Sequence, residues 1–300
     1  MAIKKTVRRK AAKKSTSKGS MAMPTEWSEA EDNPLKYVYL LYGRSGIGKT
    51  TLCASFPKAV FLSTEPGTKG LRRKEFNADD GGITDWALFR SAVDILVADK
   101  GKQFDTVVID TMDNAYNYCQ LWTCEQLGIK HVSEDKTGKS DRSGKGWTKC
   151  KTEFTDQLYR LVNAGYGLVL TSHSKVTSIE THSGEEYDFI QPSMAGQAIT
   201  VARSITDCIF YCEFAKVNGK SQRIMITEGD ELVMAKHRGT WPKYLPMELK
   251  DGFKVVADAF AGKHKGIDIE DIRSSKQTEG SAGASLSLDR SRERRKGKKK

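Results

Sequence analysis

The feature that most constrains this chain is a glycine-rich segment between an apolar run and a helix-like stretch. Residues 43–50 read Gly-Arg-Ser-Gly-Ile-Gly-Lys-Thr and match the pattern GxxxxGK[ST]. The apolar run 37–42 precedes this segment, and the helix-like stretch 51–56 follows it. Glycines at this spacing let successive backbone N–H groups turn inward around phosphate oxygens. We therefore predict a strand, a phosphate-binding loop and a helix in succession, with a nucleoside triphosphate as the ligand.

Each part of this loop has an expected role in phosphate binding. Lys49 is expected to reach the β and γ phosphates, and the Thr50 hydroxyl is expected to bind Mg²⁺. A glycine-rich turn without a ligand is the alternative, and the flanking strand and helix patterns argue against it. The predicted nucleotide-binding residues are Gly43, Arg44, Ser45, Gly46, Ile47, Gly48, Lys49, Thr50 and Thr51.

Beyond the loop, short apolar strands alternate with amphipathic helices. Strands are predicted at 59–64, 106–110 and 167–172, and helices at 114–127 and around 154–162. Fully apolar strands in this order predict an α/β fold with a mostly parallel sheet and helices on both faces. Nucleotides bind such sheets at the carboxyl ends of the strands.

The last third of the chain predicts antiparallel strands added to the parallel core. A turn at 182–185 and the dipeptide Asn218-Gly219 each separate two strand-like runs. A final helix is predicted at about 251–260. The paired strands are expected at 175–181 with 186–190, and at 207–217 with 220–227.

Positive charge is concentrated at the two ends of the chain. Residues 1–20 contribute +8 and residues 290–300 contribute +7, which leaves a net charge of −4 for the rest of a 300-residue chain whose total is +11. Such basic segments with few apolar residues are expected to be disordered, and they commonly bind nucleic acid. A solubility tail, an added extension, or an upstream start ahead of Met21 or Met23 are alternatives. The expected organisation is a basic tail at 1–33, a core domain at 34–265, and a Ser/Gly linker with a basic tail at 266–300.

The cysteines and the hydropathy pattern indicate a soluble intracellular protein. The six cysteines form no CxxC pair and have no histidine at a zinc-ligand spacing, so ordinary thiols of a reducing compartment are expected. No apolar run approaches the roughly 20 residues that a membrane-spanning helix needs. No apolar segment follows the charged N-terminus to make a secretory signal.

Three polar residues follow predicted strands and are candidates for the reaction centre. Asp110 ends the run TVVID and is a natural ligand of Mg²⁺, although an aspartate there can also cap the next helix. Glu65 is placed to act as a general base on an attacking water, or it is a solvent-facing turn residue. His173 follows LVLTS and is a candidate sensor of the γ phosphate, or a hydrogen-bonded histidine at a strand end.

A loop at residues 130–151 is a candidate for binding single-stranded nucleic acid. It holds seven Lys/Arg against three acids, and Trp147 lies near its end. Cations for phosphates and an aromatic ring for base stacking are what such a site requires. The alternative is that Trp147 is the first core residue of the next helix. The candidate residues are Lys136, Lys139, Arg142, Lys145 and Trp147.

Five segments within residues 35–262 resemble the successive motifs of phage-encoded RecA-like ATPases, the small single-strand annealing or recombinase type usually labelled AAA domain proteins. Much of this pattern is shared by many P-loop proteins. The more specific parts are the position of Glu65, the strand ending at His173, and the basic pair Lys236 and Arg238. The segments are YGRSGIGKTTL, VFLSTEPGTKGL, FDTVVIDTMDNAY, GYGLVLTSHSK and MAKHRG.

The resemblance implies a RecA-like P-loop NTPase core, DNA-stimulated ATP hydrolysis, and a homo-oligomeric ring or filament on single-stranded DNA. The expected location is the bacterial or host cytoplasm, with no membrane partner. By this resemblance Lys49, Thr50 and Asp110 bind MgATP, Glu65 is the base and His173 the sensor. Lys236 and Arg238 are the candidates for acting on a neighbouring subunit's site. The long basic ends are not part of the family pattern.

The favoured hypothesis is an ATPase that couples MgATP binding and slow hydrolysis to single-stranded DNA in recombination, annealing or repair. A nucleotide-switched binding module, such as a loader of replication proteins with little hydrolysis, is the second hypothesis. A P-loop kinase of a small metabolite is the third, and it is disfavoured because no lid or acceptor-binding motif is evident. DNA-stimulated turnover separates the first hypothesis from the other two.

Overall fold

The structure, a computed structural model, describes residues 23–67, 70–181 and 184–269. It divides into two units, residues 1–32 and 33–300. The described part of the first unit contains no helix or strand, and it exposes the side chains of Met23 and Trp27. Residues 1–22 and 270–300, which hold most of the two predicted basic tails and of the Ser/Gly linker, lie outside the described residues. All elements described below belong to the second unit.

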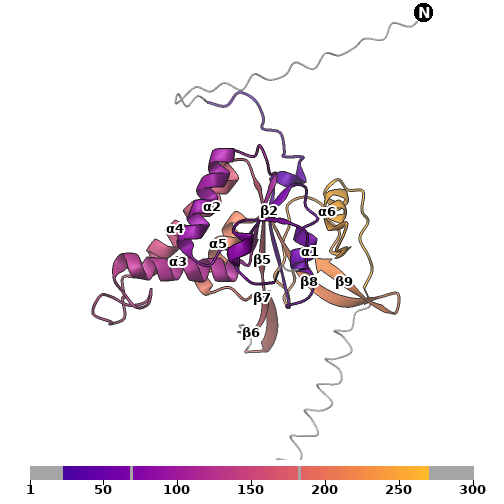
Figure 1. Cartoon of the computed structure of the whole chain (residues 1–300). Helices are drawn as coiled ribbons and strands as arrows, with labels where there is room; N and C mark the ends of the chain where they lie inside the picture. Colours follow the sequence, from indigo (N-terminus) through magenta and orange to yellow (C-terminus); the bar gives the residue numbers. More distant parts are fainter. Residues whose placement is uncertain (1–22, 68–69, 182–183, 270–300) are drawn as a thin grey trace, which may run out of the picture. The chain divides into compact units, whose positions relative to one another are not determined.

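A single mostly parallel sheet organises the second unit (Figure 1). Its strand order is β10-β9-β8-β1-β5-β4-β2-β3. The strands from β8 to β3 in this order are parallel to their neighbours, whereas β9 and β10 extend the β8 edge in antiparallel pairing. The strands are β1 (Val38–Gly43), β2 (Ala59–Ser63), β3 (Lys74–Glu75), β4 (Thr106–Asp110), β5 (Gly167–Ser172), β8 (Cys208–Val217), β9 (Lys220–Ile226) and β10 (Tyr244–Pro246).

Helices cover both faces of this sheet, as the apolar strands predicted (Figure 1). In β1, Leu40 and Tyr42 pack on the face covered by α2 to α5, and the alternate residues Tyr39 and Leu41 pack on the face covered by α1 and α6. The helices are α1 (Lys49–Cys53), α2 (Trp86–Asp99), α3 (Met112–Leu127), α4 (Lys145–Asn163), α5 (Gly196–Ile205) and α6 (Gly252–Phe260), with short 3-10 turns at Pro34–Lys36 and Ala78–Asp80. The predicted α/β fold class is confirmed.

Local sequence signals set several helix ends. The Asp85 side chain accepts a hydrogen bond from the Leu88 backbone N–H at 2.8 Å and so caps the start of α2. Lys100 and Gly128 adopt left-handed conformations at the ends of α2 and α3, with φ of 54° and 64°. The predicted bounds of β4 and β5 match the structure, and α3 begins at Met112, two residues before its predicted start at 114.

The two predicted hairpins form, but they are joined to the core in different ways. β8 pairs in parallel with β1 and is therefore part of the parallel core, and only β9 and β10 are antiparallel additions. The residues of β8 that lie beside β1 are nearly all buried, which is what a strand inside a sheet requires. Helix α5 and the short edge strands β3 and β10 were not predicted.

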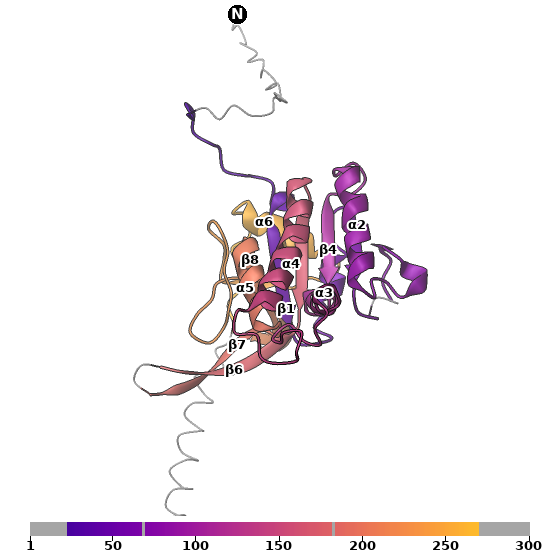
Figure 2. The ribbon, with the colours of Figure 1, turned by 90° about the vertical axis from the view of Figure 1, so that its left-hand side faces the viewer.

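The hairpin of β6 (Ser174–Glu180) and β7 (Glu186–Pro192) forms a separate two-stranded sheet. Figure 2 shows it extending away from the main sheet. Ile190 forms a parallel bridge with Val233, and the Tyr42 hydroxyl lies 3.1 Å from the Ile190 carbonyl and 2.7 Å from that of Met234. These contacts attach the base of the hairpin to the central strand β1.

Aromatic packing between helices α2, α3 and α4 forms much of the core on their side of the sheet. The ring centroid of Phe154 lies 5.6 Å from that of Trp86 and 5.1 Å from that of Tyr116. Trp86 also stacks on Phe89, and its indole N–H donates to the Glu153 carboxylate at 3.1 Å. The Phe154 side chain is fully buried at the centre of this cluster.

We predict that Phe154→Ala lowers the free energy of unfolding by about 3–5 kcal/mol, because it leaves a cavity among these rings. Urea titration of the wild type and the variant measures the difference. Tyr159→Ala on the same helix is the control, since the Tyr159 side chain is 44% exposed. Equal losses in the two variants would contradict the assignment of Phe154 to the core.

Candidate functional site

The predicted phosphate-binding loop leaves the carboxyl end of the central strand β1 and leads directly into α1. Gly46 and Gly48 have φ angles of 76° and 105°, which favour glycine. A Cβ atom at Gly48 would lie 2.6 Å from the Cδ2 atom of Leu249, and one at Gly43 would lie 2.3 Å from the carbonyl oxygen of Cys212. Backbone conformation therefore favours glycine at position 48, and the close approach of the Cys212 backbone requires it at position 43.

The Lys49 side chain is buried and folds back over this loop. Its ammonium donates hydrogen bonds to the carbonyl oxygens of Gly43 at 2.8 Å and Arg44 at 3.1 Å. Burial lowers the pKa of Lys49, and the nearby thiol of Cys212 and carboxylate of Asp110 partly oppose that shift. Phosphate oxygens would give this cation stronger acceptors than two neutral carbonyls. This position inside the loop is compatible with the predicted contact of Lys49 with phosphates.

Asp110 lies at the carboxyl end of β4 with its side chain almost fully buried. Its Oδ1 atom accepts a hydrogen bond from the Thr171 hydroxyl on β5 at 2.5 Å. A carboxylate and the hydroxyl of Thr50 are oxygen donors of the type that Mg²⁺ prefers. Among the described residues no group of three or more His, Cys, Asp or Glu side chains is arranged to hold a metal. Where Mg²⁺ is bound by one or two protein oxygens, it usually takes its remaining ligands from substrate phosphates and water.

Glu65 follows β2 and is held by hydrogen bonds at the same edge of the sheet. Its Oε1 atom accepts from the Thr111 hydroxyl at 2.7 Å and from the Asn114 side-chain amide at 3.3 Å. Its Oε2 atom lies 3.4 Å from Nε2 of His173, which follows β5. The structure therefore brings together Glu65 and His173, which are 108 positions apart in the sequence. Thr111 and Asn114 were not identified from the sequence.

A buried threonine sets the position of this carboxylate. The Thr64 hydroxyl accepts from the Thr111 backbone N–H at 2.9 Å and donates to the Thr111 carbonyl at 2.8 Å. The Thr64 backbone N–H donates to the Asp110 carbonyl at 2.7 Å. These bonds tie the end of β2 to the end of β4, so the segments carrying Glu65 and Asp110 are held side by side. No sequence signal marked Thr64, because a threonine after a strand is common.

Lys236 and Arg238 lie near the amino ends of β1 and β8, opposite the strand ends that carry Glu65 and Asp110. The Arg238 guanidinium pairs with Asp207 at 2.8 Å, and Asp207 accepts from the backbone N–H of Val38 at the amino end of β1. The Lys236 ammonium donates to the Arg203 carbonyl at 2.7 Å. Burial lowers the pKa of Lys236, and the neighbouring Arg238 charge lowers it further. Neither residue is near the loop of its own chain, and their action on a neighbouring subunit stays a prediction.

The predicted nucleic-acid loop is shorter than expected, because α4 begins at Lys145. Asp141 accepts from the Lys145 backbone N–H at 2.9 Å, and Gly144 takes the left-handed conformation before the helix. Trp147 is half-buried, packs against the core, and makes an edge contact with the His131 ring. The structure thus supports the alternative interpretation of Trp147 as a core residue of this helix. Three of the predicted basic residues, Lys136, Lys139 and Arg142, are exposed in the loop.

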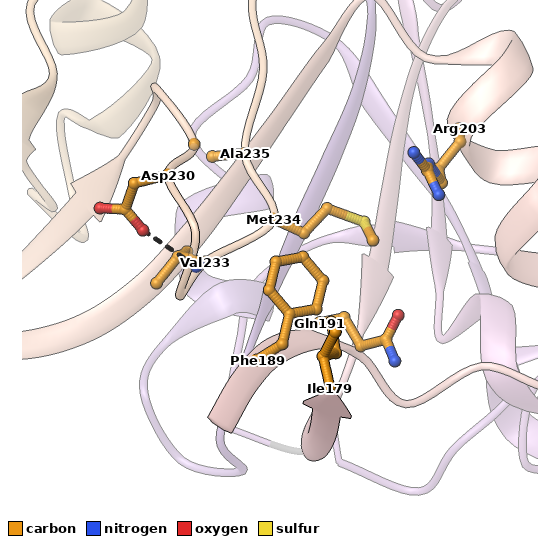
Figure 3. Close-up of a pocket in the computed structure, with 9 residues that line it drawn as sticks. Ile179, Phe189, Gln191, Arg203, Asp230, Val233, Met234 and Ala235 are labelled. Atoms are coloured by element: carbon orange, nitrogen blue, oxygen red, sulfur yellow. Dashed lines mark hydrogen bonds between the residues drawn. The ribbon is translucent and has the colours of Figure 1, made fainter. Parts of the chain in front are cut away.

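A hollow of about 430 Å³ lies away from the phosphate-binding loop (Figure 3). It is bounded by β6 and β7, by Arg203 of α5, and by the segment at 229–235. The Asp230 carboxylate accepts the backbone N–H of Val233 at 3.0 Å and closes the turn on one side of the hollow. None of the residues predicted to take part in nucleotide chemistry lines it. Its walls include Ile179, Phe189, Gln191, Val233 and Met234.

The loop, Lys49 and the acidic groups that follow the parallel strands at their carboxyl ends are the features of an α/β P-loop NTPase fold. The chain belongs to the AAA domain family, whose model matches residues 35–239. The described residues contain no helix with the length and apolar composition needed to span a membrane.

Two solved structures are distantly similar to this chain. No curated protein matches the chain. Among solved structures, a KaiC-like protein from Pyrococcus horikoshii is 13% identical, with 72% of this chain and 88% of that chain covered and a TM-score of 0.38. The flagellar accessory protein FlaH from Methanocaldococcus jannaschii is 11% identical, with coverage of 79% and 90% and a TM-score of 0.37.

We predict that Lys49→Ala weakens MgATP binding by about 10- to 100-fold, the range for losing hydrogen bonds from a charged donor. Calorimetric titration of the folded variant measures this change. Lys58→Ala is the matched control, because the Lys58 side chain is 62% exposed and its ion pair with Asp105 lies at the surface. Unchanged MgATP affinity in Lys49→Ala would contradict the assignment of the loop.

Proposed function

We propose that this protein is an ATPase that couples MgATP binding and slow hydrolysis to single-stranded DNA in recombination, annealing or repair. The observation that carries the hydrolytic part is the placement of Glu65. Its carboxylate is held by Thr111 and Asn114 and lies beside His173, at the strand edge that also presents the P-loop and Asp110. A carboxylate that is held in place and whose side chain is still 32% exposed suits the activation of a water molecule.

In the proposed reaction, the oxygen of that water attacks the γ phosphorus and the bond to the β–γ bridging oxygen breaks. Glu65 accepts the proton of the water, and ADP carries the electron pair of the broken bond. Lys49 and the loop N–H groups stabilise negative charge on the β and γ phosphates. Thr50 and Asp110 would hold Mg²⁺, which when bound supplies further charge neutralisation at these phosphates.

His173 connects Glu65 to the β6–β7 hairpin. It contacts Glu65 on one side, and its carbonyl accepts the backbone N–H of Ser193 at 2.8 Å, just after β7. It also directly precedes β6, so a change at the γ phosphate would reach both ends of the β6–β7 hairpin. The same contact favours the second candidate function, a nucleotide-switched binding module or loader that hydrolyses ATP little.

The proposed DNA partner is supported by the exposed cations of the loop before α4. Lys136, Lys139 and Arg142 are exposed, and the Asp135 and Asp141 side chains there accept backbone N–H groups of their own turns. The basic tails, which lie outside the described residues, are proposed to add affinity without sequence preference. We propose a homo-oligomer in which Lys236 and Arg238 of one subunit complete the site of the next.

We predict that Glu65→Gln keeps MgATP affinity but slows hydrolysis by about 10²-fold or more, the usual scale for losing a general base. Thr111→Val should slow hydrolysis less, because it removes one of the hydrogen bonds that position Glu65. Single-turnover hydrolysis and calorimetric binding separate the two effects. If Glu65→Gln loses affinity while bound ATP turns over at the normal rate, Glu65 has a structural role instead.

We predict that single-stranded DNA stimulates ATP turnover. We also predict that a triple alanine variant at Lys136, Lys139 and Arg142 binds single-stranded DNA with a weaker dependence on salt concentration. Three lost phosphate contacts should reduce the slope of log K against log salt by about 2. A triple alanine variant at the exposed Lys58, Lys102 and Lys254 is the control.

The same titrations on protein lacking residues 1–20 and 290–300 measure the share of binding that the tails supply. ATP hydrolysis without any DNA stimulation, in protein that binds MgATP, would favour the switched-module hypothesis. An unchanged salt slope in the Lys136, Lys139 and Arg142 variant would remove the loop from the DNA site.

A further inference from the structure

An aromatic ring with two guanidinium groups over it lies beside the P-loop. The Cζ atom of Arg44 is 4.7 Å from the ring centroid of Phe214, and that of Arg223 is 5.0 Å from it. Phe214 is half-buried on β8, whereas Arg44 is exposed in the loop itself. Neither arginine forms an ion pair with a carboxylate anywhere in the described ranges. Two cations without carboxylate partners beside a phosphate site favour an anionic ligand.

This cluster is built against the P-loop. The Arg223 side chain donates through Nε to the Ile47 carbonyl at 3.1 Å, and the Arg223 carbonyl accepts the backbone N–H of Met247. Leu249 is so close to the loop that a Cβ at Gly48 would lie 2.6 Å from its Cδ2 atom. Phe214, Arg223 and Leu249 thus form one wall along the loop, here called the Phe214 wall.

The sheet order determines which end of a nucleotide can meet this wall. Glu65, Asp110 and His173 follow β2, β4 and β5, which lie on one side of β1, whereas β8 and β9 lie on the other side. The γ phosphate has to lie beside the groups that act on it. A triphosphate extended across the loop therefore directs its nucleoside toward β8.

The register of β8 against β1 places Phe214 level with the P-loop. Cys212 pairs with Gly43, the last residue of β1, so Phe214 lies two residues beyond the carboxyl end of that strand. Two residues of strand span about 7 Å, which brings the ring to the level of the loop above the sheet edge. A nucleobase leaving the loop on this side meets the half-buried ring.

We propose that Phe214 is the platform on which the base of the bound nucleotide stacks. Arg223 contacts both the ring and the Ile47 carbonyl, and the exposed Arg44 guanidinium, which lies 4.7 Å from the ring centroid, would move off the ring when the base binds and cover the other face of the base. This assignment rests on the proposed nucleotide-binding function and adds the base-contacting residue of the same site. Stacking uses the flat face of the base, so the Phe214 ring contributes affinity for the nucleoside and none for the phosphates.

The test compares two ligands that share the phosphates but differ in the base, namely MgATP and magnesium tripolyphosphate. Calorimetric titrations are made on the wild type, Phe214→Ala, Phe214→Trp and Phe214→Leu. Phe214→Ala should weaken MgATP by about 5- to 150-fold, the range for losing one base–aromatic stack, and should change tripolyphosphate less than about twofold. Phe214→Trp should retain MgATP affinity. Phe214→Leu keeps an apolar side chain of similar size without a ring, so it should behave as Phe214→Ala and remain folded.

Equal weakening of both ligands would overturn the proposal, because Phe214 would then only support the loop. No change in either ligand would also overturn it, because the base would lie elsewhere. Failure of the proposed function is a different result, since the wild type would then bind neither ligand. Lys49→Ala, which should weaken both ligands together, shows that the phosphate part of the site is being measured.

Discussion

The burial of strand β1 is the constraint on which the rest of the structure depends. All six of its residues are buried, and it pairs in parallel with β5 on one side and β8 on the other. Helices cover both faces, so its apolar side chains are removed from water on each. This packing holds Gly43 against the Cys212 carbonyl and thereby fixes the start of the P-loop. A loop on a less rigid strand would not present its N–H groups in a constant arrangement.

The proposed reaction centre depends on a second constraint, which is polar. Thr64 and Thr111 join the ends of β2 and β4 through three backbone and side-chain hydrogen bonds, including the one from the Thr64 N–H to Asp110. The buried hydroxyl of Thr64 acts as donor and acceptor at once, so neither of its bonds can be lost without leaving an unsatisfied group. Rigid placement of Glu65 is therefore a property of two neighbouring strand ends.

Sequence patterns were informative where a local rule applies. The loop glycines, the strands β4 and β5, and the Asn218-Gly219 turn follow from motif, apolar run and turn chemistry, and the structure confirms each. Sequence patterns predicted the structure less well where packing between distant segments determines it. Trp147 lies in a basic segment and was therefore a candidate for stacking on nucleic-acid bases. In the structure, the turn closed by Asp141 starts α4 early, and the Trp147 ring packs against the core. Helix α5 was missed because its short amphipathic pattern follows a hairpin rather than a strand of the sheet.

By itself the sequence determined the nucleotide-binding loop and the candidates Lys49, Asp110, Glu65 and His173, because each depends on the pattern within one short segment. It also determined the α/β class, because apolar strands alternate with amphipathic helices along the chain. Only the tertiary structure decided which of these residues contact one another. The pairing of β4 with both β2 and β5 brings Glu65 to Thr111 and to His173, and the parallel pairing of β8 with β1 brings Phe214 to the loop. Such contacts join residues tens to more than a hundred positions apart. They arise from burying apolar strands side by side, which no local pattern specifies.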